Sequence, residues 1–442
     1  MSRKRRRLPD EPVAIEISDL AHDGRGVGRV DGKVTFVHGA LPGERVQARL
    51  TGRNRRFDEA VTVSVEAPSE DRVEPECPWF GYCGGCALQH LSPSGQLRWK
   101  QARLAENLKR IGQVEPEEWL EPIATDPWQY RRRARLSARN VPGKGRVLVG
   151  FRELGGRYVA DIEHCRILVP AFSGRLMALS ELIGALSIPS AVPQVEIAAG
   201  DDSAAILLRH LEPLTESDLA ILENWAEETG IAVYLQPAGP DSVHRLAPAD
   251  HELSYRLPEF GLQLAHDPRH FIQVNAGVNR QLISTALDLM APGPSDRMLD
   301  LFCGLGNFTL PLATRAGRVI GVEGDPALIA AARANARHNG LDNVEWFCAD
   351  LAVAEPDLPW MKSGFEGVLI DPPRSGATEI LSLVATSGAA RLVYVSCDPA
   401  TLARDAGMLV GAHGFRLAAA GIVDMFPHTA HVESITLFTR DA

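Results

Sequence analysis

The sequence predicts an α/β fold in three parts: an N-terminal OB-like β-barrel, a central α+β domain and a C-terminal Rossmann-like doubly wound sheet. Three observations predict it. The chain of 442 residues is too long for one ordinary core. Residues 13–68 hold short alternating strands separated by glycine-rich turns, which is typical of a five-stranded barrel. From residue 271 to 442, strand-like runs alternate with helical runs, which requires parallel crossovers.

The composition indicates a soluble globular protein. Hydrophobic residues make up 45% of the chain and no apolar run approaches eighteen residues, so we expect no membrane span. Residues 1–12 are basic with no apolar stretch behind them, which predicts a disordered arm and not a secretory signal. The seven cysteines are too few for a disulfide scaffold and suit the reducing cytoplasm. Of these, Cys303 and Cys348 are expected in apolar surroundings.

The central domain is expected over residues 69–270. Within it, residues 93–112 predict a helix that presents Leu97, Leu104, Leu108 and Ile111 on one face and could pack against the C-terminal domain. The net charge of -10 argues against a protein that coats nucleic acid through its overall field. Residues 127–157 are nevertheless locally basic. That segment is either a solvated strand face or a surface that contacts phosphate.

A glycine loop follows the first strand of the C-terminal part, in the run DLFCGLGN of residues 300–307. Such a loop lets the backbone approach a ligand at the carboxyl edge of the sheet. Glu323 follows about twenty residues later, where an acid can accept hydrogen bonds from ribose hydroxyls. Asp350, at the end of the next strand, could meet an adenine amino group. The loop lacks the third glycine of the dinucleotide fingerprint, which disfavours a nicotinamide cofactor, and it resembles the loop of class I methyltransferases.

Two further strand ends carry chemistry. Residues 371–374, DPPR, resemble the motif with which methyltransferases meet a target base, and alone would fit methylation of an adenine amino group. Cys397, in SCDP, places a thiol beside the same crevice. Carbon 5 of uracil becomes nucleophilic only after a soft nucleophile adds at carbon 6, and cysteine suits that role. A general base must then remove the carbon-5 proton, and Glu433 in PHTAHVE is the candidate. The plainer interpretations are a small buried cysteine and a carboxylate on a strand face.

The motifs FIQVN, DLFCGLGNF, DPPR, SCDP and PHTAHVE occur in the same order as in the RNA 5-methyluridine methyltransferases, and the chain resembles that family. The resemblance implies Cys397 as nucleophile, Glu433 as base and Phe271 against the target base. Relatives that make 5-methylcytosine have a cysteine where this chain has Arg374, which favours uracil. The resemblance also implies S-adenosylmethionine as cofactor, in contact with Gln273, Phe302, Asn307, Glu323, Asp350 and Asp371.

A cysteine cluster precedes the predicted helix. Cys77, Cys83 and Cys86, with Cys165 downstream, offer four thiolates. On spacing alone they could hold zinc or a [4Fe-4S] cluster, and Cys83 with Cys86 could form a redox pair. Ribosomal members of the family have a similar run to CPWFGYCGGCALQH, and the resemblance implies an iron-sulfur cluster.

Residues 22–37 resemble a TRAM domain, a barrel that binds RNA through basic and aromatic side chains. The plainer interpretation is a structural β module. A barrel combined with a cysteine cluster resembles the bacterial enzyme that modifies the uridine numbered 1939 in 23S ribosomal RNA. We therefore expect a cytoplasmic monomer with 23S ribosomal RNA as partner, and neither DNA nor a membrane. Two alternatives remain: a 5-methyluridine enzyme for another ribosomal or transfer RNA site, and a redox-sensing RNA-binding protein with an inert methyltransferase domain.

Overall fold

The computed structural model describes residue 8 and residues 11–353, 358–361 and 364–441. The N-terminal arm expected over residues 1–12 lies mostly outside these. The chain divides into two compact units. The first comprises Met1–Lys100, Phe151–Ala160 and Phe426–His431, and the second Gln101–Gly150, Asp161–Met425 and Val432–Ala442. Each unit is therefore assembled from segments far apart in the sequence.

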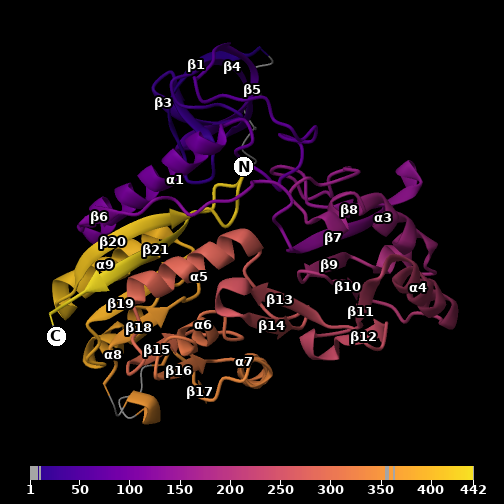
Figure 1. Cartoon of the computed structure of the whole chain (residues 1–442). Coiled ribbons are helices and arrows are strands. Elements are labelled where there is room, and N and C mark those ends of the chain that lie inside the picture. Colours follow the sequence, from indigo (N-terminus) through magenta and orange to yellow (C-terminus); the bar gives the residue numbers. More distant parts are fainter. Residues whose placement is uncertain (1–7, 9–10, 354–357, 362–363, 442) are drawn as a thin grey trace, which may run out of the picture. The chain divides into compact units, whose positions relative to one another are not determined.

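The N-terminal strands form a closed barrel in the order β1-β2-β3-β5-β4 (Figure 1). Ile15, Val37 and Val46 are fully buried inside it, as the alternating pattern predicts. Gly28 on β2 is required for closure, since a Cβ there would lie 2.4 Å from Cγ2 of Ile15. The expected five-stranded barrel is confirmed. Its strands are β1 (Val13–Leu20), β2 (Gly26–Val30), β3 (Lys33–His38), β4 (Arg45–Arg53) and β5 (Phe57–Ala67).

The predicted helix forms, but its end differs from the prediction. Helix α1 spans Pro93–Asn107 and is followed by a π-helical turn, η1, over Leu108–Gly112. Leu104 and Leu108 are buried as predicted, whereas Ile111 is 48% exposed. The prediction for Ile111 was wrong because the wider π turn rotates it off the buried face. Gly112 is buried instead, against the backbone of Ala403.

A six-stranded mixed sheet with strand order β12-β11-β10-β9-β7-β8 and a separate hairpin, β13–β14, lie in the second unit. The strands are β7 (Arg133–Val141), β8 (Arg146–Gly150), β9 (Gln194–Ala199), β10 (Ala204–Arg209), β11 (Ile231–Gln236), β12 (His244–Ala247), β13 (Leu253–Leu257) and β14 (Leu262–His266). The helices are α2 (Pro170–Ser173), α3 (Leu176–Ala185) and α4 (Glu216–Thr229), with short turns η2 (Pro142–Lys144), η3 (Pro189–Ala191), η4 (Pro240–Ser242) and η5 (Pro258–Phe260).

The basic segment around β7 is partly neutralised by acids. Arg135 pairs with Glu196 at 3.0 Å, and Lys144 and Arg146 both pair with Asp161. Ion pairs within the protein reduce the charge that these side chains could offer to phosphates. The pairing supports a structural role for at least these three cations.

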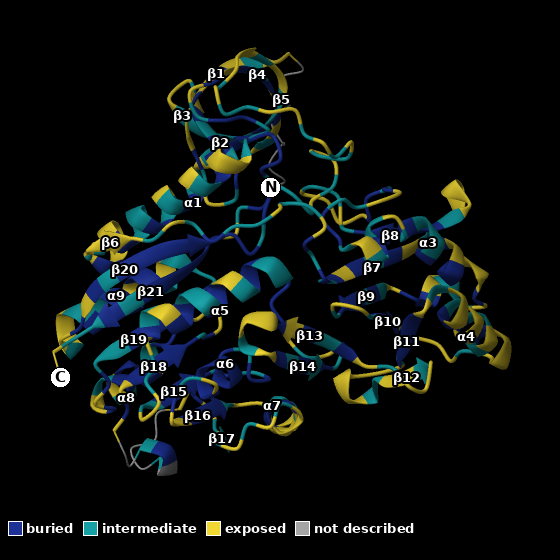
Figure 2. Ribbon diagram, viewed as in Figure 1, coloured by how far each residue is buried: buried dark blue, intermediate teal, exposed yellow. Residues whose placement is uncertain are grey.

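The C-terminal sheet has eight strands in the order β17-β16-β15-β18-β19-β21-β20-β6. Strands β15 to β19 are mutually parallel, and the closing strands β20 and β21 are antiparallel to each other. This confirms the doubly wound sheet and its closing pair, and Figure 2 shows the central strands buried. The strands are β15 (Arg297–Leu301), β16 (Arg318–Glu323), β17 (Val344–Cys348), β18 (Gly367–Ile370), β19 (Arg391–Ser396), β20 (Arg416–Val423), β21 (Glu433–Thr439) and the short β6 (Glu118–Trp119).

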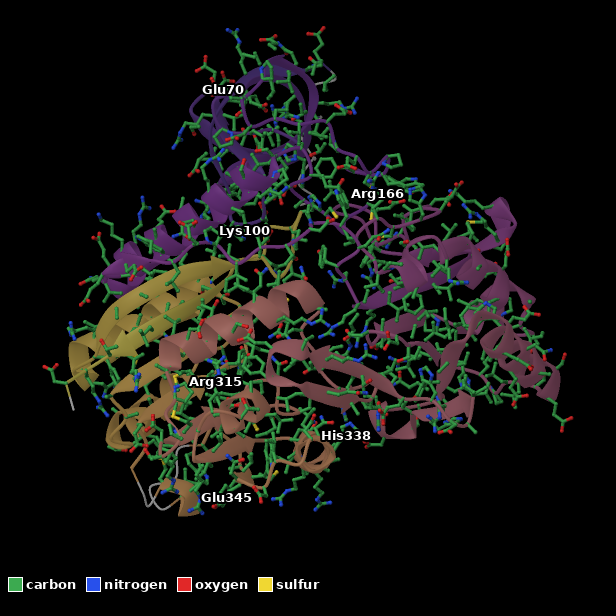
Figure 3. All side chains as sticks on the ribbon, in the orientation of Figure 1. Glu70, Lys100, Arg166, Arg315, His338 and Glu345 are labelled. Atoms are coloured by element: carbon green, nitrogen blue, oxygen red, sulfur yellow. The ribbon has the colours of Figure 1, made fainter. Side chains whose placement is uncertain are left out.

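The helices that connect these strands are α5 (Ala276–Met290), α6 (Thr309–Ala313), α7 (Pro326–His338), α8 (Leu381–Thr386) and α9 (Pro399–His413), with turns η6 (Pro359–Met361) and η7 (Thr378–Ile380). Helix α9 was not singled out from the sequence. Arg315, labelled in Figure 3, lies just beyond α6. It pairs with Glu259 of η5 at 3.0 Å and with Asp288 of α5 at 3.4 Å. In the described part of the chain, no helix combines the length and apolar character needed to cross a membrane.

The close approach between η1 and α9 should be sensitive to one added methyl group. A Cβ at Gly112 would lie 2.4 Å from the carbonyl oxygen of Ala403. We expect Gly112→Ala to lower the free energy of unfolding by about 1–3 kcal/mol through overpacking, measured by urea denaturation. The control is Gly184→Ala in α3, where a Cβ meets nothing within 4 Å. That change should be neutral or stabilising, and equal effects of the two substitutions would contradict the packing.

Candidate active site

The reactive side chains meet because of how the strands pair. Parallel β18 and β19 end at Ile370 and Ser396, so Asp371 and Cys397 follow at the same edge of the sheet. Antiparallel β21 pairs with β19 so that Ser396 lies opposite Ser434. This register places Glu433 beside Cys397 although the two are far apart in sequence. The structure therefore brings together the predicted nucleophile, the predicted base and the predicted DPPR carboxylate.

Burial and negative neighbours disfavour the thiolate form of Cys397. Burial raises the pKa of the thiol to about 11, and the charges of Glu433 and Asp371 act in the same direction. Arg374 opposes them and lowers the pKa. Cys397 is half-buried, unlike a core cysteine, so the plainer interpretation as an inert packing residue is disfavoured. A pKa of about 11 favours the thiol over the thiolate at neutral pH.

Asp371 is held beside Gln273. The Gln273 side-chain amide donates a hydrogen bond to the Asp371 carboxylate at 3.4 Å. Burial raises the pKa of Asp371 to about 7, and the hydrogen bond from Gln273 lowers it. Phe271, two residues before Gln273, is 65% exposed and so is available to a large ligand. The FIQVN and DPPR motifs therefore converge on one site.

The glycine loop after β15 adopts a backbone that few sequences tolerate. Phe302, Gly304 and Gly306 have φ values of 63°, 55° and 97°. A non-glycine residue in the left-handed region is strained, and such strain clusters at ligand sites. A Cβ at Gly306 would lie 3.0 Å from Leu310 Cγ. Burial raises the pKa of Asp300, at the end of β15, to about 8.

Asn307 closes this loop through a hydrogen-bonded cluster. Its Oδ1 accepts from the hydroxyl of Tyr255 at 2.9 Å and from Nδ2 of Asn279 at 3.0 Å. Its Nδ2 donates to Asn279 Oδ1 at 2.9 Å. The pairing ties the loop to α5 and to the β13–β14 hairpin.

The two remaining predicted cofactor residues lie at the ends of β16 and β17. Glu323 accepts the backbone N–H of Gly304 at 3.1 Å and that of Gly324 at 2.8 Å. These bonds fix the carboxylate next to the glycine loop. Asp350 is exposed and accepts the N–H of Ala352 at 2.9 Å. Both acids occupy the carboxyl edge expected of ligand-binding residues in such sheets.

Asp405 on α9 supports the segment that follows the DPPR motif. No sequence motif indicated this residue. Its buried carboxylate accepts the N–H of Ala377 at 2.8 Å and the hydroxyls of Thr378 at 3.0 Å and Tyr394 at 2.8 Å. These bonds anchor the segment that follows DPPR to β19, the strand that carries Cys397. Because α9 was not predicted from the sequence, the supporting role of Asp405 could not be predicted either.

The other cysteines fall into different environments. Cys77, Cys83 and Cys86 are half-buried in the first unit, and the N–H of Gly85 donates to Cys83 Sγ at 3.4 Å. Burial raises the pKa of Cys83, and Cys77 raises it further. Cys165 belongs to the second unit. Among the residues described, no group of three or more His, Cys, Asp or Glu is arranged to hold a metal ion.

Cys303 and Cys348, both expected in apolar surroundings, differ in burial. Cys303 is buried, but the charges of Asp300 and Glu323 act on its thiol, so its surroundings are only partly apolar. Cys348 is exposed, which corrects the expectation. The cause is its position at the C-terminal end of β17, the edge strand of the sheet. An apolar sequence context does not bury a residue at such a position.

The doubly wound sheet, its strained glycine loop and the acids beyond it define a methyltransferase that uses S-adenosylmethionine. Residues 245–441 match the model of the tRNA (Uracil-5-)-methyltransferase family, and residues 10–66 match the TRAM domain. The chain belongs to the RNA 5-methyluridine methyltransferase family.

Full-length relatives and a solved structure agree with this assignment. The chain is 54% identical to 23S rRNA (uracil(1939)-C(5))-methyltransferase RlmD of Alkalilimnicola ehrlichii and 51% identical to that of Xanthomonas axonopodis pv. citri, with 100% of each chain covered. The structure of Pyrococcus abyssi tRNA (uracil-54, C5)-methyltransferase in complex with S-adenosyl-L-homocysteine matches 96% of this chain and 99% of its own, at a TM-score of 0.74 and 24% identity. That likeness shows the shared fold.

Removal of a negative charge beside Cys397 should change the reactivity of its thiol. Thiolates, not thiols, react with iodoacetamide. Glu433→Gln removes a negative neighbour, so the thiol pKa should fall and alkylation of Cys397 at pH 8 should accelerate by roughly 3- to 10-fold. Peptide mass spectrometry measures the rate. Glu345→Gln on β17, which three strands separate from β19 in the sheet, should change nothing. An unchanged rate in Glu433→Gln would show that the two groups do not interact.

Proposed function

We propose that the chain methylates carbon 5 of uridine 1939 in 23S ribosomal RNA, the reaction named for relatives that match its full length. The observation that carries the chemistry is the position of Cys397 between Asp371 and Glu433. S-adenosylmethionine, when bound, supplies an electrophilic methyl group. We expect the enzyme to act as a monomer in the cytoplasm.

Cys397 is proposed as the nucleophile. Its sulfur forms a bond to carbon 6 of the uracil, and the carbon 5–carbon 6 π electrons move into an enolate. Carbon 5 would then take the methyl group, with S-adenosylhomocysteine as the leaving thioether. The thiol must first lose its proton, because its pKa of about 11 leaves little thiolate at neutral pH. Arg374 is the neighbouring cation that favours the thiolate.

Glu433 is proposed as the base that completes turnover. After methylation, carbon 5 still carries its proton, and removal of that proton drives re-formation of the double bond as the sulfur leaves carbon 6. Glu433 is 8% exposed, and its charge reaches Cys397. Gln273, Phe302, Asn307, Glu323, Asp350 and Asp371 are proposed to contact S-adenosylmethionine.

The barrel is proposed to contact the RNA. Arg25 lies 4.6 Å from the centroid of the Phe36 ring, which meets Phe57 edge-on at 5.4 Å. Arg53, Arg55 and Arg56 on the neighbouring turn are exposed. Arg25 is paired with Asp23 at 2.7 Å, so the exposed arginines of the turn are the cations available to RNA. Barrels of this type bind single-stranded nucleic acid with such cations and with aromatic rings.

The nucleophile can be tested by removing its sulfur. Cys397→Ala should reduce methyl transfer to 23S RNA by about 10⁴-fold or more, because losing a covalent nucleophile disables the whole sequence of steps. The assay is incorporation of labelled methyl groups. Cys348→Ala, a change at an exposed cysteine of the same unit, should retain activity. Substantial methylation by Cys397→Ala would refute the covalent route.

The role of Glu433 as base can be tested independently of the nucleophile by following the hydrogen on carbon 5. With RNA labelled by tritium at carbon 5 of the target uridine, Glu433→Gln should slow tritium release about 10²-fold or more. The variant should still form the covalent bond, so RNA-linked protein should accumulate on a denaturing gel. Wild-type tritium release in this variant would assign the base to another group.

The RNA site distinguishes this proposal from its alternatives. A strain that lacks the gene should lose 5-methyluridine at position 1939 of 23S ribosomal RNA, the site named for the relatives, when modified nucleosides are mapped. Loss only in transfer RNA, or at another ribosomal position, would contradict the proposed substrate. An inert redox-sensing RNA-binding protein would leave every 5-methyluridine in place.

We also propose a [4Fe-4S] cluster on Cys77, Cys83, Cys86 and Cys165. The support is the resemblance of the CPWFGYCGGCALQH run to ribosomal members of the family. Anaerobically purified protein should contain iron and acid-labile sulfide in equal amounts, and Cys83→Ser should lose both. Stoichiometric zinc without sulfide would refute the cluster. No step of the reaction is assigned to it.

A further inference from the structure

Arg132, outside every recognised motif, is a buried cation beside the cofactor residues. It directly precedes β7 and is 2% exposed. Its Nε donates to the carbonyl oxygen of Gln273 at 2.9 Å, and its backbone N–H donates to that of Val274 at 2.9 Å. Nη1 and Nη2 have no hydrogen-bond partner among the described residues. Two donors of one guanidinium are thus left for another group.

The Arg132 guanidinium lies against the ring of Tyr255, and Tyr255 in turn contacts the glycine loop. The central carbon of the guanidinium lies 4.5 Å from the centroid of the Tyr255 ring. The Tyr255 hydroxyl in turn donates to Asn307 at 2.9 Å. Arg132 therefore contacts Gln273 directly, and the Tyr255 side chain connects it to Asn307. Gln273 and Asn307 are both proposed to contact S-adenosylmethionine.

Among the described residues, no acid accepts a hydrogen bond from Nη1 or Nη2 of Arg132. Asp201 attracts it, but the Asp201 carboxylate accepts Nη2 of Arg280 and the N–H of Arg256, both at 2.8 Å. Burial lowers the pKa of Arg132, although an arginine remains charged in proteins. A desolvated guanidinium with two adjacent unpaired nitrogens is suited to a carboxylate, which accepts two parallel hydrogen bonds.

We infer that Arg132 binds the carboxylate of the methionine moiety of S-adenosylmethionine, an inference that rests on the proposed function. The amino-acid end is the anionic part of that molecule. The protein groups proposed to contact the cofactor include the acids Glu323, Asp350 and Asp371, which repel a carboxylate. Arg132 supplies the cation that this set lacks.

Calorimetry on the full chain without RNA tests the inference with two ligands. S-adenosylhomocysteine carries the carboxylate, and S-adenosyl-3-thiopropylamine is the same molecule without it. The wild type should bind the first about 30-fold more tightly or better, as expected for a buried charge pair. Arg132→Met should lose that preference by weakening S-adenosylhomocysteine alone, while Arg132→Lys should keep part of it.

Arg315→Met is the matched control, because it removes one positive charge from the same unit at a residue paired with Glu259 and Asp288. It should bind both ligands like the wild type. Equal weakening of both ligands by Arg132→Met would overturn the inference and leave Arg132 a residue that only positions Gln273. An unchanged preference would also overturn it. If the wild type bound neither ligand, the proposed function itself would fail, which is a distinguishable result.

Discussion

The account depends on the antiparallel pairing of β21 with β19, which sets a carboxylate next to a thiol. With Ser396 opposite Ser434, Glu433 must lie beside Cys397, and the parallel partner β18 brings Asp371 to the same edge. Burial raises the pKa of the Cys397 thiol, and the charges of Glu433 and Asp371 act in the same direction. A positive charge that enters the site would favour the thiolate.

Much of the remaining structure holds this edge in place. Asp405 on α9 binds the segment after DPPR and the hydroxyl of Tyr394 on β19. Gln273 joins the segment before α5 to Asp371. On the other side, the strained loop at Phe302 is held by Glu323 and by the Asn307 cluster. Rigid strand ends supported by buried hydrogen bonds are what a reaction with several precisely ordered bond changes requires.

The sequence predicted the features that depend on local pattern. Alternating strands, the glycine loop and the motif at each strand end all depend on neighbouring residues, and all were recognised. Features that depend on distant partners were not: Asp405 and Arg132 acquire their roles only when separate segments meet. Ile111 was misjudged because a π turn changes the helical period, and Cys348 because exposure depends on which strand lies at the edge. For the basic segment around β7 the sequence left two interpretations open, because its acidic partners Glu196 and Asp161 lie on other segments.

The most direct test of the account is to identify the protein atom that attacks the uracil ring. RNA with 5-fluorouridine at the target position cannot lose its carbon-5 substituent as a proton, so a covalent intermediate should persist. Digestion of the trapped complex and tandem mass spectrometry should place the methylated nucleotide on Cys397. A stable adduct on any other residue, or methylated RNA released without an adduct, would contradict the central claim.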